Sequence, residues 1–479
     1  MNLSMIVYLL GWILAIEGGL MLLPAAVSLI YAEQAVWSFL ITAGICGVFS
    51  LPLILRKPKS RVFYLKDGFI VTGLTWILIS IFGALPFVLN GCIPNYVDAL
   101  FEIVSGFTTT GASVVADLDA LPKGMIFWRC FAHWIGGMGV LVFLLALLPH
   151  TGGSHVNVMK AESPGPQVEK LVPSVQATAK ILYGIYISMT AGLLVLLLLT
   201  RMPLFDAVTL TFGTAGTGGF GISNIGFAAY TPLQQWIITV GMIMFGVNFN
   251  FYFLLILLKI KRAFSIEEVR WYFIVILTAV TLITVDIYGT FDTLGETVRH
   301  AAFQGGSIIT TTGFSTVDFD LWPTFSKTIL VVLMFVGACA GSTGGGMKVS
   351  RFVVLFKTIR QELRHVLNPS RVSVTVMDGK QVSYEVLRSI NVYVITFVAI
   401  FAGSILLISL DGFDPTTNFT AVAATLNNIG PGLAAVGPTQ NFGIYSAGAK
   451  LVLIFDMLAG RLELFPMLLL FSRETWRKF

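Results

Sequence analysis

Charged residues are scarce in this chain of 479 residues: only 11% are Asp, Glu, Lys or Arg, 56% are hydrophobic, and the mean hydropathy is +0.85. An ordinary soluble domain has about a quarter of its residues charged, so this composition excludes that class. Runs of roughly 20 apolar residues recur along the chain, and such a run can cross about 30 Å of hydrocarbon as a helix. The sequence therefore predicts an all-α membrane protein in contact with lipid.

Cysteine and histidine are also few. The four cysteines, Cys46, Cys92, Cys130 and Cys339, have no metal or redox spacing. The five histidines are dispersed, whereas a membrane-embedded enzyme needs acid, base or metal-ligating side chains at one depth. The chain also lacks a basic stripe with interleaved aromatic residues, so nucleic acid is not an expected partner. We expect a protein that is not an enzyme and holds no organic cofactor.

Glycine and threonine, in contrast, recur in four short loops that interrupt hydrophobic sequence. The loops read Thr-Thr-Gly-Ala-Ser at 109–113, Thr-Gly-Gly-Phe-Gly at 217–221, Thr-Thr-Gly-Phe-Ser at 311–315 and Asn-Ile-Gly-Pro-Gly at 428–432. Each resembles the Thr-Val-Gly-Tyr-Gly filter of potassium channels. Irregular backbone is tolerated within a membrane only where protein buries it or where it faces a watery cavity. Four such loops indicate a pseudo-fourfold ring around one cavity.

The rest of the sequence fits a repeated plan. We expect a leading pair of transmembrane helices at 4–30 and 36–55, then four units of outer helix, pore helix with loop, and second helix. The outer helices are expected at 68–89, 180–200, 271–288 and 386–410, and the second helices at 125–148, 233–258, 324–341 and 447–471. This plan has ten transmembrane helices and divides the chain into a leading pair (1–60) and pore units at 61–165, 166–265, 266–380 and 381–479. Repeats of this kind favour internal duplication.

The distribution of basic residues predicts the orientation. Under this plan 24 Lys and Arg residues lie on one side of the membrane and 6 on the other. Because cytoplasmic loops carry the excess of Lys and Arg, both termini are expected in the cytoplasm. The four loops then open toward the outside.

The loops suit an alkali cation that has lost its water, because rings of backbone carbonyls can replace the hydration shell. A central glycine allows the backbone conformations that point successive carbonyls at one axis. The candidate potassium ligands are the first three residues of each loop: Thr109, Thr110, Gly111, Thr217, Gly218, Gly219, Thr311, Thr312, Gly313, Asn428, Ile429 and Gly430.

Two ambiguities concern these loops. In the fourth loop the filter glycine could be Gly430 or Gly432, and we prefer Gly430 because it superposes on the central glycine of the motif. In the second loop, residues 216–221 also match the dinucleotide fingerprint G-x-G-x-x-G. That match lacks a βαβ context and a later acidic residue, so it is weak.

The third unit carries a glycine-rich stretch at 337–346, followed by Met347 and Lys348. Because an interior glycine costs up to about 1 kcal/mol in a helix, we expect a flexible break on the cytoplasmic side of the filter. It would block or clear the ion path, with Gly341, Gly344, Gly345, Gly346 and Lys348 as gate residues. A simple kink or helix end is the alternative.

Arg461 lies inside the last hydrophobic run. Ionisable groups within a membrane are costly and usually face the protein interior or a water-filled cavity. Arg461 could form an electrostatic barrier to cations below the filter, with Asp456 or Glu463 as counter-charge. It could equally form a structural ion pair with one of those carboxylates.

With these loops, the glycine-rich stretch and Arg461, the whole chain resembles the Trk/Ktr/HKT superfamily of potassium transporters. The resemblance implies a homodimer in the bacterial inner membrane, uptake of potassium and rubidium, and TrkA-like cytosolic regulatory subunits that bind NAD(H) or adenine nucleotides. It also implies that residues 337–346 gate the pore and that Arg461 lies beside them in the ion path. The alternative is a proton- or sodium-coupled potassium symporter with alternating access.

Overall fold

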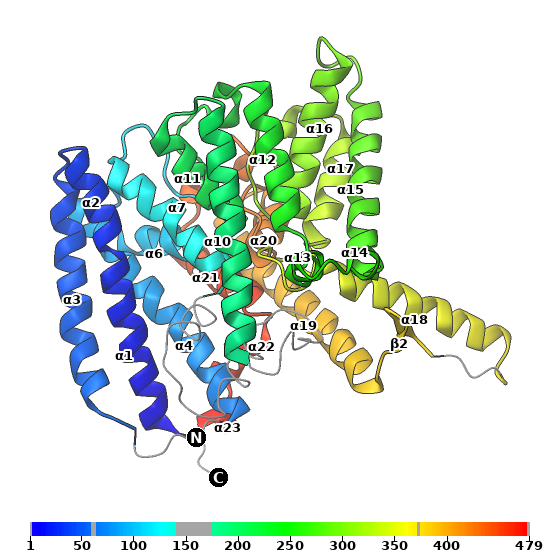
Figure 1. Cartoon of the computed structure of the whole chain (residues 1–479), viewed down its shortest axis with the longest axis horizontal. Helices are drawn as coiled ribbons and strands as arrows, with labels where there is room; N and C mark the ends of the chain where they lie inside the picture. The colour runs from blue at the N-terminus through cyan, green and yellow to red at the C-terminus, as the bar shows by residue number, and fades with distance from the viewer. Residues whose placement is uncertain (1, 59–63, 140–174, 371–373, 477–479) are drawn as a thin grey trace.

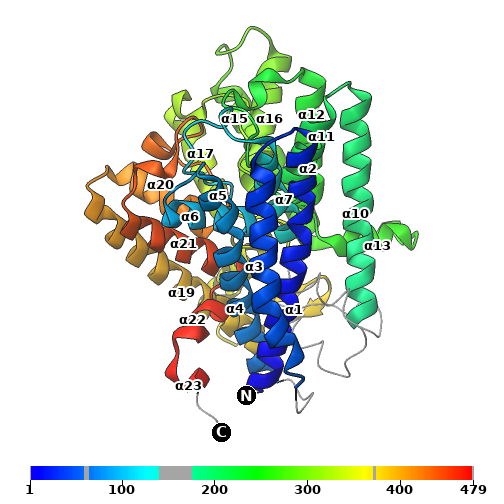
Figure 2. The ribbon, with the colours of Figure 1, turned by 90° about the vertical axis from the view of Figure 1, so that its left-hand side faces the viewer.

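The computed structural model describes residues 2–58, 64–139, 175–370 and 374–476, and these are overwhelmingly helical. The leading pair comprises α1 (Leu3–Leu20) with α2 (Leu22–Ile30), and α3 (Ala35–Leu55). These helices stand side by side at one edge of the molecule, and α1 packs against α3 and α4 (Figures 1 and 2). Both termini lie at the same end of the structure (Figure 1).

Four helical units follow the leading pair. Their outer helices are α4 (Leu65–Gly83) continued by α5 (Leu85–Asn90), then α10 (Val175–Leu199), α15 (Glu267–Asp286) and α19 (Tyr384–Ile408). Their pore helices are the shorter α6 (Tyr96–Phe107), α11 (Leu204–Ala215), α16 (Leu294–Ile309) and α20 (Pro415–Leu426). The second helices begin with α7 (Lys123–Gly137), α12 (Pro232–Phe245), α17 (Thr324–Phe335) and α21 (Ala447–Arg461).

The expected second helices were wrong in their lengths. The run 233–258 is two helices, α12 and α13 (Phe249–Ile256), bent by 92°. α17 ends at Phe335 instead of 341, and the run 447–471 is divided into α21 and α22 (Phe465–Phe471). The helix expected to reach 148 ends at Gly137 among the described residues, and its expected part beyond 139 lies outside them.

Local contacts explain two of these breaks. At the end of α12, a Cβ added to Gly246 would lie 2.4 Å from the Tyr272 hydroxyl, so α15 approaches the backbone there. The Asn248 side chain then accepts a hydrogen bond from Asn250 N–H and starts α13 in a new direction. After α21, Glu463 and Leu464 both have positive φ, at +56° and +68°. Such conformations cannot continue a right-handed helix.

Because several expected helices are broken, fewer than the expected ten crossings can be counted as single long helices among the described residues. Among the described residues, six helices are long and apolar enough to cross a membrane, or seven if α12 and α13 form one span. Two of the expected unit boundaries, 60/61 and 165/166, fall outside the described residues. The boundary at 265/266 falls between α14 (Ile260–Phe264) and α15, and the one at 380/381 falls inside strand β2.

The four units close into a ring. Each second helix packs against the pore helix of the next unit: α7 against α11, α12 against α16, α17 against α20, and finally α21 against α6. The last contact joins the fourth unit to the first. The order of the units in the sequence is therefore their order around a common axis.

A helical arm extends from the ring between the third and fourth units (Figure 1). It contains α18 (Val349–Leu367) and a small hairpin of β1 (Val376–Met377) and β2 (Lys380–Gln381), which pair antiparallel. The plan read from the sequence placed no helix or strand between 341 and 386. A short α23 (Arg473–Trp476) follows α22.

Candidate functional site

The four loops have the same backbone conformation. The first residue of each loop has φ between +53° and +57°: Thr109, Thr217, Thr311 and Asn428. The third residue is a glycine with φ between +79° and +102°: Gly111, Gly219, Gly313 and Gly430. Positive φ is uncommon for residues other than glycine and is held only where the surroundings enforce it. Its recurrence at one position in four loops shows a common local structure.

One hydrogen bond recurs in all four loops and ties each of them to its pore helix. The second residue of each loop donates its N–H to a carbonyl in the last turn of that helix, at 2.8 to 2.9 Å: Thr110 to Ser105, Gly218 to Gly213, Thr312 to Ser307, and Ile429 to Ala424. Each loop therefore starts at the carboxyl end of a helix. That end carries partial negative charge and favours a cation nearby.

The loops touch one another in cyclic order through their glycines. A Cβ added to each glycine would lie 1.8 to 2.7 Å from a carbonyl oxygen of the next loop: Gly111 from Gly218, Gly219 from Thr312, Gly313 from Ile429, and Gly430 from Thr110. Only glycine permits this close approach. In the fourth loop Gly430 occupies the equivalent position, whereas a Cβ on Gly432 would meet the Thr420 and Val436 side chains instead.

The side chains at the first loop position differ among the units. Thr109 and Thr217 each donate a hydroxyl hydrogen bond of 2.7 Å to the preceding carbonyl. Asn428 Nδ2 donates to Thr110 Oγ1 at 3.0 Å and to the Met457 carbonyl at 2.9 Å, which joins the fourth loop to the first. The Thr311 hydroxyl accepts from Gly345 N–H at 2.6 Å, so the third loop contacts the glycine-rich stretch.

The glycine-rich stretch is a loop, because α17 ends at Phe335 and the next helix begins at Val349. It packs directly against the third and fourth loops. A Cβ on Gly345 would lie 2.8 Å from Asn428 Cβ, and a Cβ on Gly344 would lie 3.0 Å from the Thr310 carbonyl oxygen. We call residues 336–348 the inner loop.

Lys348 and Arg461 both bind carbonyl oxygens around the inner loop. Lys348 Nζ donates to the Gly344 carbonyl and, at 3.0 Å, to the Gly345 carbonyl. Arg461 donates to the Thr343 carbonyl at 2.9 Å and to the carbonyls of Gly136 and Gly137 at the end of α7. Arg461 thus joins the inner loop to the first unit.

The two carboxylates considered as partners of Arg461 have other partners. Glu463 forms an ion pair with Arg351, and Asp456 accepts a hydrogen bond of 2.7 Å from Ser404. A cavity of about 80 Å³ lies beside Arg461, lined by the inner loop, the end of α7 and the break after α21.

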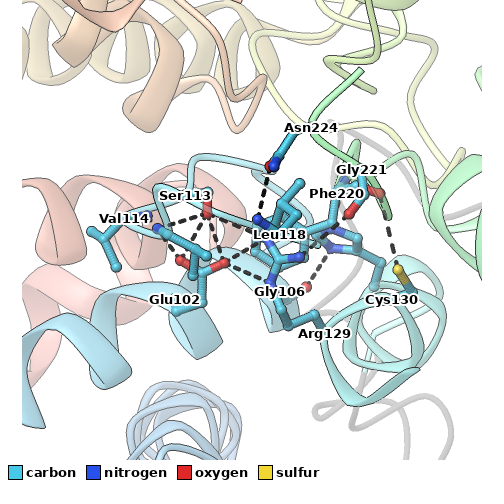
Figure 3. Close-up of polar contacts among 12 residues, drawn as sticks. Glu102, Gly106, Ser113, Val114, Leu118, Arg129, Cys130, Phe220, Gly221 and Asn224 are labelled. Atoms are coloured by element: carbon cyan, nitrogen blue, oxygen red, sulfur yellow. Dashed lines mark hydrogen bonds and ion pairs between the residues drawn. The ribbon is translucent and has the colours of Figure 1, made fainter. Parts of the chain in front are cut away.

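Sequence reasoning missed a buried network between the first and second loops (Figure 3). Glu102 and Arg129 form an ion pair at 2.6 Å, and His133 contacts both α6 and the second loop. In the sequence, His133 stood out only as one of five dispersed histidines. The charges of Glu102 and Arg129 in apolar sequence were the one available signal.

The same two loops are also joined at the surface. Asn224, after the second loop, donates to the Asp117 carboxylate at 2.8 Å and accepts from Leu118 N–H at 2.8 Å. The hydrogen bond from the Asn224 side chain lowers the pKa of Asp117. Asp117 therefore loses its proton more readily than an aspartate without this hydrogen bond, and it lies among the residues that follow the first loop.

Comparison with known proteins supplies a family for this arrangement. Residues 36–478 match the TrkH family, described as cation transport proteins. The chain is 34% identical to the Trk system potassium uptake protein TrkH of Salmonella typhimurium, over 100% of both chains. It is 31% identical to the Trk system potassium uptake protein TrkG of Escherichia coli, over 99% of both. The crystal structure of the potassium transporter TrkH from Vibrio parahaemolyticus matches with a TM-score of 0.90 and 32% identity, over 100% of both chains.

Proposed function

This chain belongs to the TrkH family of cation transport proteins, and on that premise we propose that it takes up potassium through a pore enclosed by its four loops. Relatives matched over the whole length are named as potassium uptake proteins. The chain is accordingly a transporter and not an enzyme. Potassium, and rubidium as its close analogue, would be the transported ion.

The observation that carries this proposal is the cyclic contact of the four filter loops. Each central glycine lies against a carbonyl oxygen of the next loop, so carbonyls from all four units come together around one axis. Rings of carbonyl oxygens can replace the water that a potassium ion loses on entering a membrane. We propose that the carbonyls of the first three residues in each loop are the ligands.

We further propose that the inner loop gates this pore. It contacts the third and fourth filter loops through Gly344 and Gly345, and both Lys348 and Arg461 bind its carbonyls. Ions leaving the filter would pass this loop. The positive charge of Arg461, together with that of a protonated Lys348, would oppose cations until the loop moved.

The remaining features of the proposal concern the cellular setting. The word "system" in the names of the relatives indicates more than one component. We propose a homodimer in the bacterial inner membrane, with both termini in the cytoplasm and a TrkA-like cytosolic subunit that binds NAD(H) or adenine nucleotides. The basic arm that contains α18 would lie on the side of that subunit.

The test is the Gly313→Ser variant in proteoliposomes, with rubidium uptake measured in competition with sodium. A Cβ at Gly313 would lie 1.9 Å from the Ile429 carbonyl oxygen, and φ is +84°. We expect the preference for potassium and rubidium over sodium to fall by about tenfold, which corresponds to about 1.4 kcal/mol. Unchanged preference would show that the filter assignment is wrong.

A matched control is Gly289→Ser. Gly289 has a similar positive φ, of +87°, so a serine there would carry the same backbone strain. A Cβ at Gly289, however, would meet nothing within 4 Å. It should keep wild-type preference. The same vesicles also address the coupled-symporter alternative, because uptake that requires a proton or sodium gradient would indicate coupling instead of passive conduction.

A further inference from the structure

A buried ion pair between α6 and α7 holds the two ends of the first filter loop. Glu102, on α6, and Arg129, on α7, have side chains at most 1% exposed, and Arg129 Nε donates to Glu102 Oε1 at 2.7 Å. Glu102 also accepts from the Ser113 hydroxyl and from Val114 N–H, both at 2.9 Å (Figure 3). One carboxylate therefore links the pore helix that precedes the loop with the chain that leaves it.

Arg129 extends this network to the second filter loop. Its Nη1 donates to the Gly221 carbonyl at 3.3 Å, and its guanidinium carbon lies 4.0 Å from the centre of the Phe220 ring. Residues 220–221 directly follow the filter residues of that loop. The guanidinium thus binds the first loop through Glu102 and the second loop through Phe220 and Gly221.

His133, one turn further along α7, makes a parallel connection. Its Nε2 accepts from Phe220 N–H at 3.2 Å, and its Nδ1 lies 2.7 Å from the Gly106 carbonyl in α6. Because a carbonyl only accepts and an amide N–H only donates, these partners require a neutral ring with the proton on Nδ1. Two adjacent residues at the end of the second loop are therefore attached to α7: Phe220 by His133 and Gly221 by Arg129.

The charge pair is not needed to form a pore helix. The positions equivalent to Glu102, nine residues before the central glycine of each loop, are occupied by Leu210, Gln304 and Ala421. All three belong to complete pore helices. Burying an ion pair is often no more stabilising than burying apolar residues of similar volume. A requirement of the first two loops, beyond helix stability, explains why charges are present here.

We propose that Glu102 and Arg129 are positioning residues that set the separation of the first and second filter loops, and through it the preference among cations. This inference rests on the proposed function. The residues that follow the filter carbonyls of the two loops are held by this ion pair: Ser113 and Val114 donate to Glu102, and the Gly221 carbonyl accepts from Arg129. Loosening this connection lets the carbonyls close around a smaller ion, so sodium is excluded less well.

The decisive variant is Arg129→Lys. Lysine keeps the charge that pairs with Glu102, but its ammonium lacks the planar fork that reaches Gly221 and stacks on Phe220. We expect the preference for rubidium over sodium, measured in proteoliposomes, to fall about tenfold. The maximum uptake rate per folded transporter should change far less. A purely structural role would lower the yield of folded protein and leave the preference at its wild-type value.

Ser113→Ala provides a milder change for the case in which Arg129→Lys does not fold. It removes a hydroxyl that donates to Glu102 and accepts from Arg129 Nη2 at 3.2 Å. We expect a smaller loss of preference, of about threefold. The control is Arg299→Gln, which breaks a partly exposed ion pair with Glu296 on another pore helix and should keep the wild-type preference.

The outcomes separate this inference from the proposed function. If Gly313→Ser loses selectivity while folded Ser113→Ala and Arg129→Lys keep it, the filter stands and the positioning role is refuted. If Ser113→Ala folds with wild-type preference and Arg129→Lys does not fold, the positioning role is likewise refuted. If Gly313→Ser itself keeps full selectivity, the filter assignment has failed, and the positioning role fails with it.

Discussion

At the residue scale, the molecule depends on carbonyl oxygens that take the place of water around a positive charge. In the proposed filter, carbonyl oxygens of the four loops would take this part for the cation, and those of the inner loop take it for Lys348 and Arg461. A buried ammonium or guanidinium needs such partners, because an unpaired charge in apolar surroundings is costly. The same chemical group thus serves the proposed permeation path and the proposed gate.

Lys348→Met tests the gate at this scale. Methionine has a similar length but donates nothing to the carbonyls of Gly344 and Gly345, so the inner loop loses hydrogen bonds worth about 1.5–3 kcal/mol each. We expect rubidium uptake per folded transporter to rise about tenfold. Lys357→Met is the matched control, since Lys357 pairs with Glu267 on α15 and lies outside the inner loop. Equal or lower uptake by Lys348→Met would refute the gate.

From the sequence, we could locate those residues whose motif lies within one short stretch of the chain. The glycine and threonine of each filter loop are adjacent in the chain, and the loop conformation follows from those few residues, so both could be located in advance. Glu102 and Arg129 are 27 residues apart, and Arg129 reaches Gly221 across 92 residues. Such pairs depend on how the units pack around the ring, which a single sequence does not specify.

At the element scale, the first and fourth pore helices are each held by a close backbone contact with the second helix of their own unit. In the first unit a Cβ on Gly136 of α7 would lie 1.8 Å from the Phe107 carbonyl oxygen at the end of α6. In the fourth unit a Cβ on Gly460 of α21 would lie 2.0 Å from the Leu426 carbonyl oxygen at the end of α20. Small residues permit this backbone approach between membrane helices.

Gly136→Ala tests this packing. Its methyl group meets backbone that cannot rotate away, so we expect a loss of about 1–3 kcal/mol in stability and a lower Tm for the purified protein in detergent. Gly184→Ala on α10 is the control, because a Cβ there meets nothing within 4 Å. Alanine at Gly184 should preserve or slightly raise Tm, since it favours helix by up to about 1 kcal/mol. Equal Tm values for both variants would contradict the close contact.

Hydrophobicity predicted where the transmembrane helices lie better than it predicted where they bend or end. It identified the outer helices because each is one apolar run of sufficient length. It failed at the bend after α12 and the break after α21, where the apolar sequence continues but the backbone turns. Transfer to lipid depends on the composition of a run, whereas the turn depends on Tyr272 against Gly246 and on positive φ at Glu463.

At the scale of the whole molecule, the asymmetric distribution of basic residues predicts which end faces the cytoplasm. Lys380 lies in the exposed hairpin of the arm, and Leu321 lies between the third filter loop and α17 with 83% of its surface exposed. We expect a membrane-impermeant thiol reagent added to intact cells to label Leu321→Cys and spare Lys380→Cys. Cys46, Cys130 and Cys339 are buried but Cys92 is partly exposed, so both variants are made in a Cys92→Ala chain to keep the background labelling low. The reverse labelling pattern would invert the topology.

The closure of the ring by the contact of α21 with α6 has a consequence for biosynthesis. Thr110 and Asn428, whose side chains are bonded, are 318 residues apart, so a ribosome delivers one long before the other. No enclosed conduit exists in the nascent chain until its final hairpin has been inserted. A translation product that stops before α21 therefore lacks the contact that closes the ring, and we expect such unfinished copies to leak no ions.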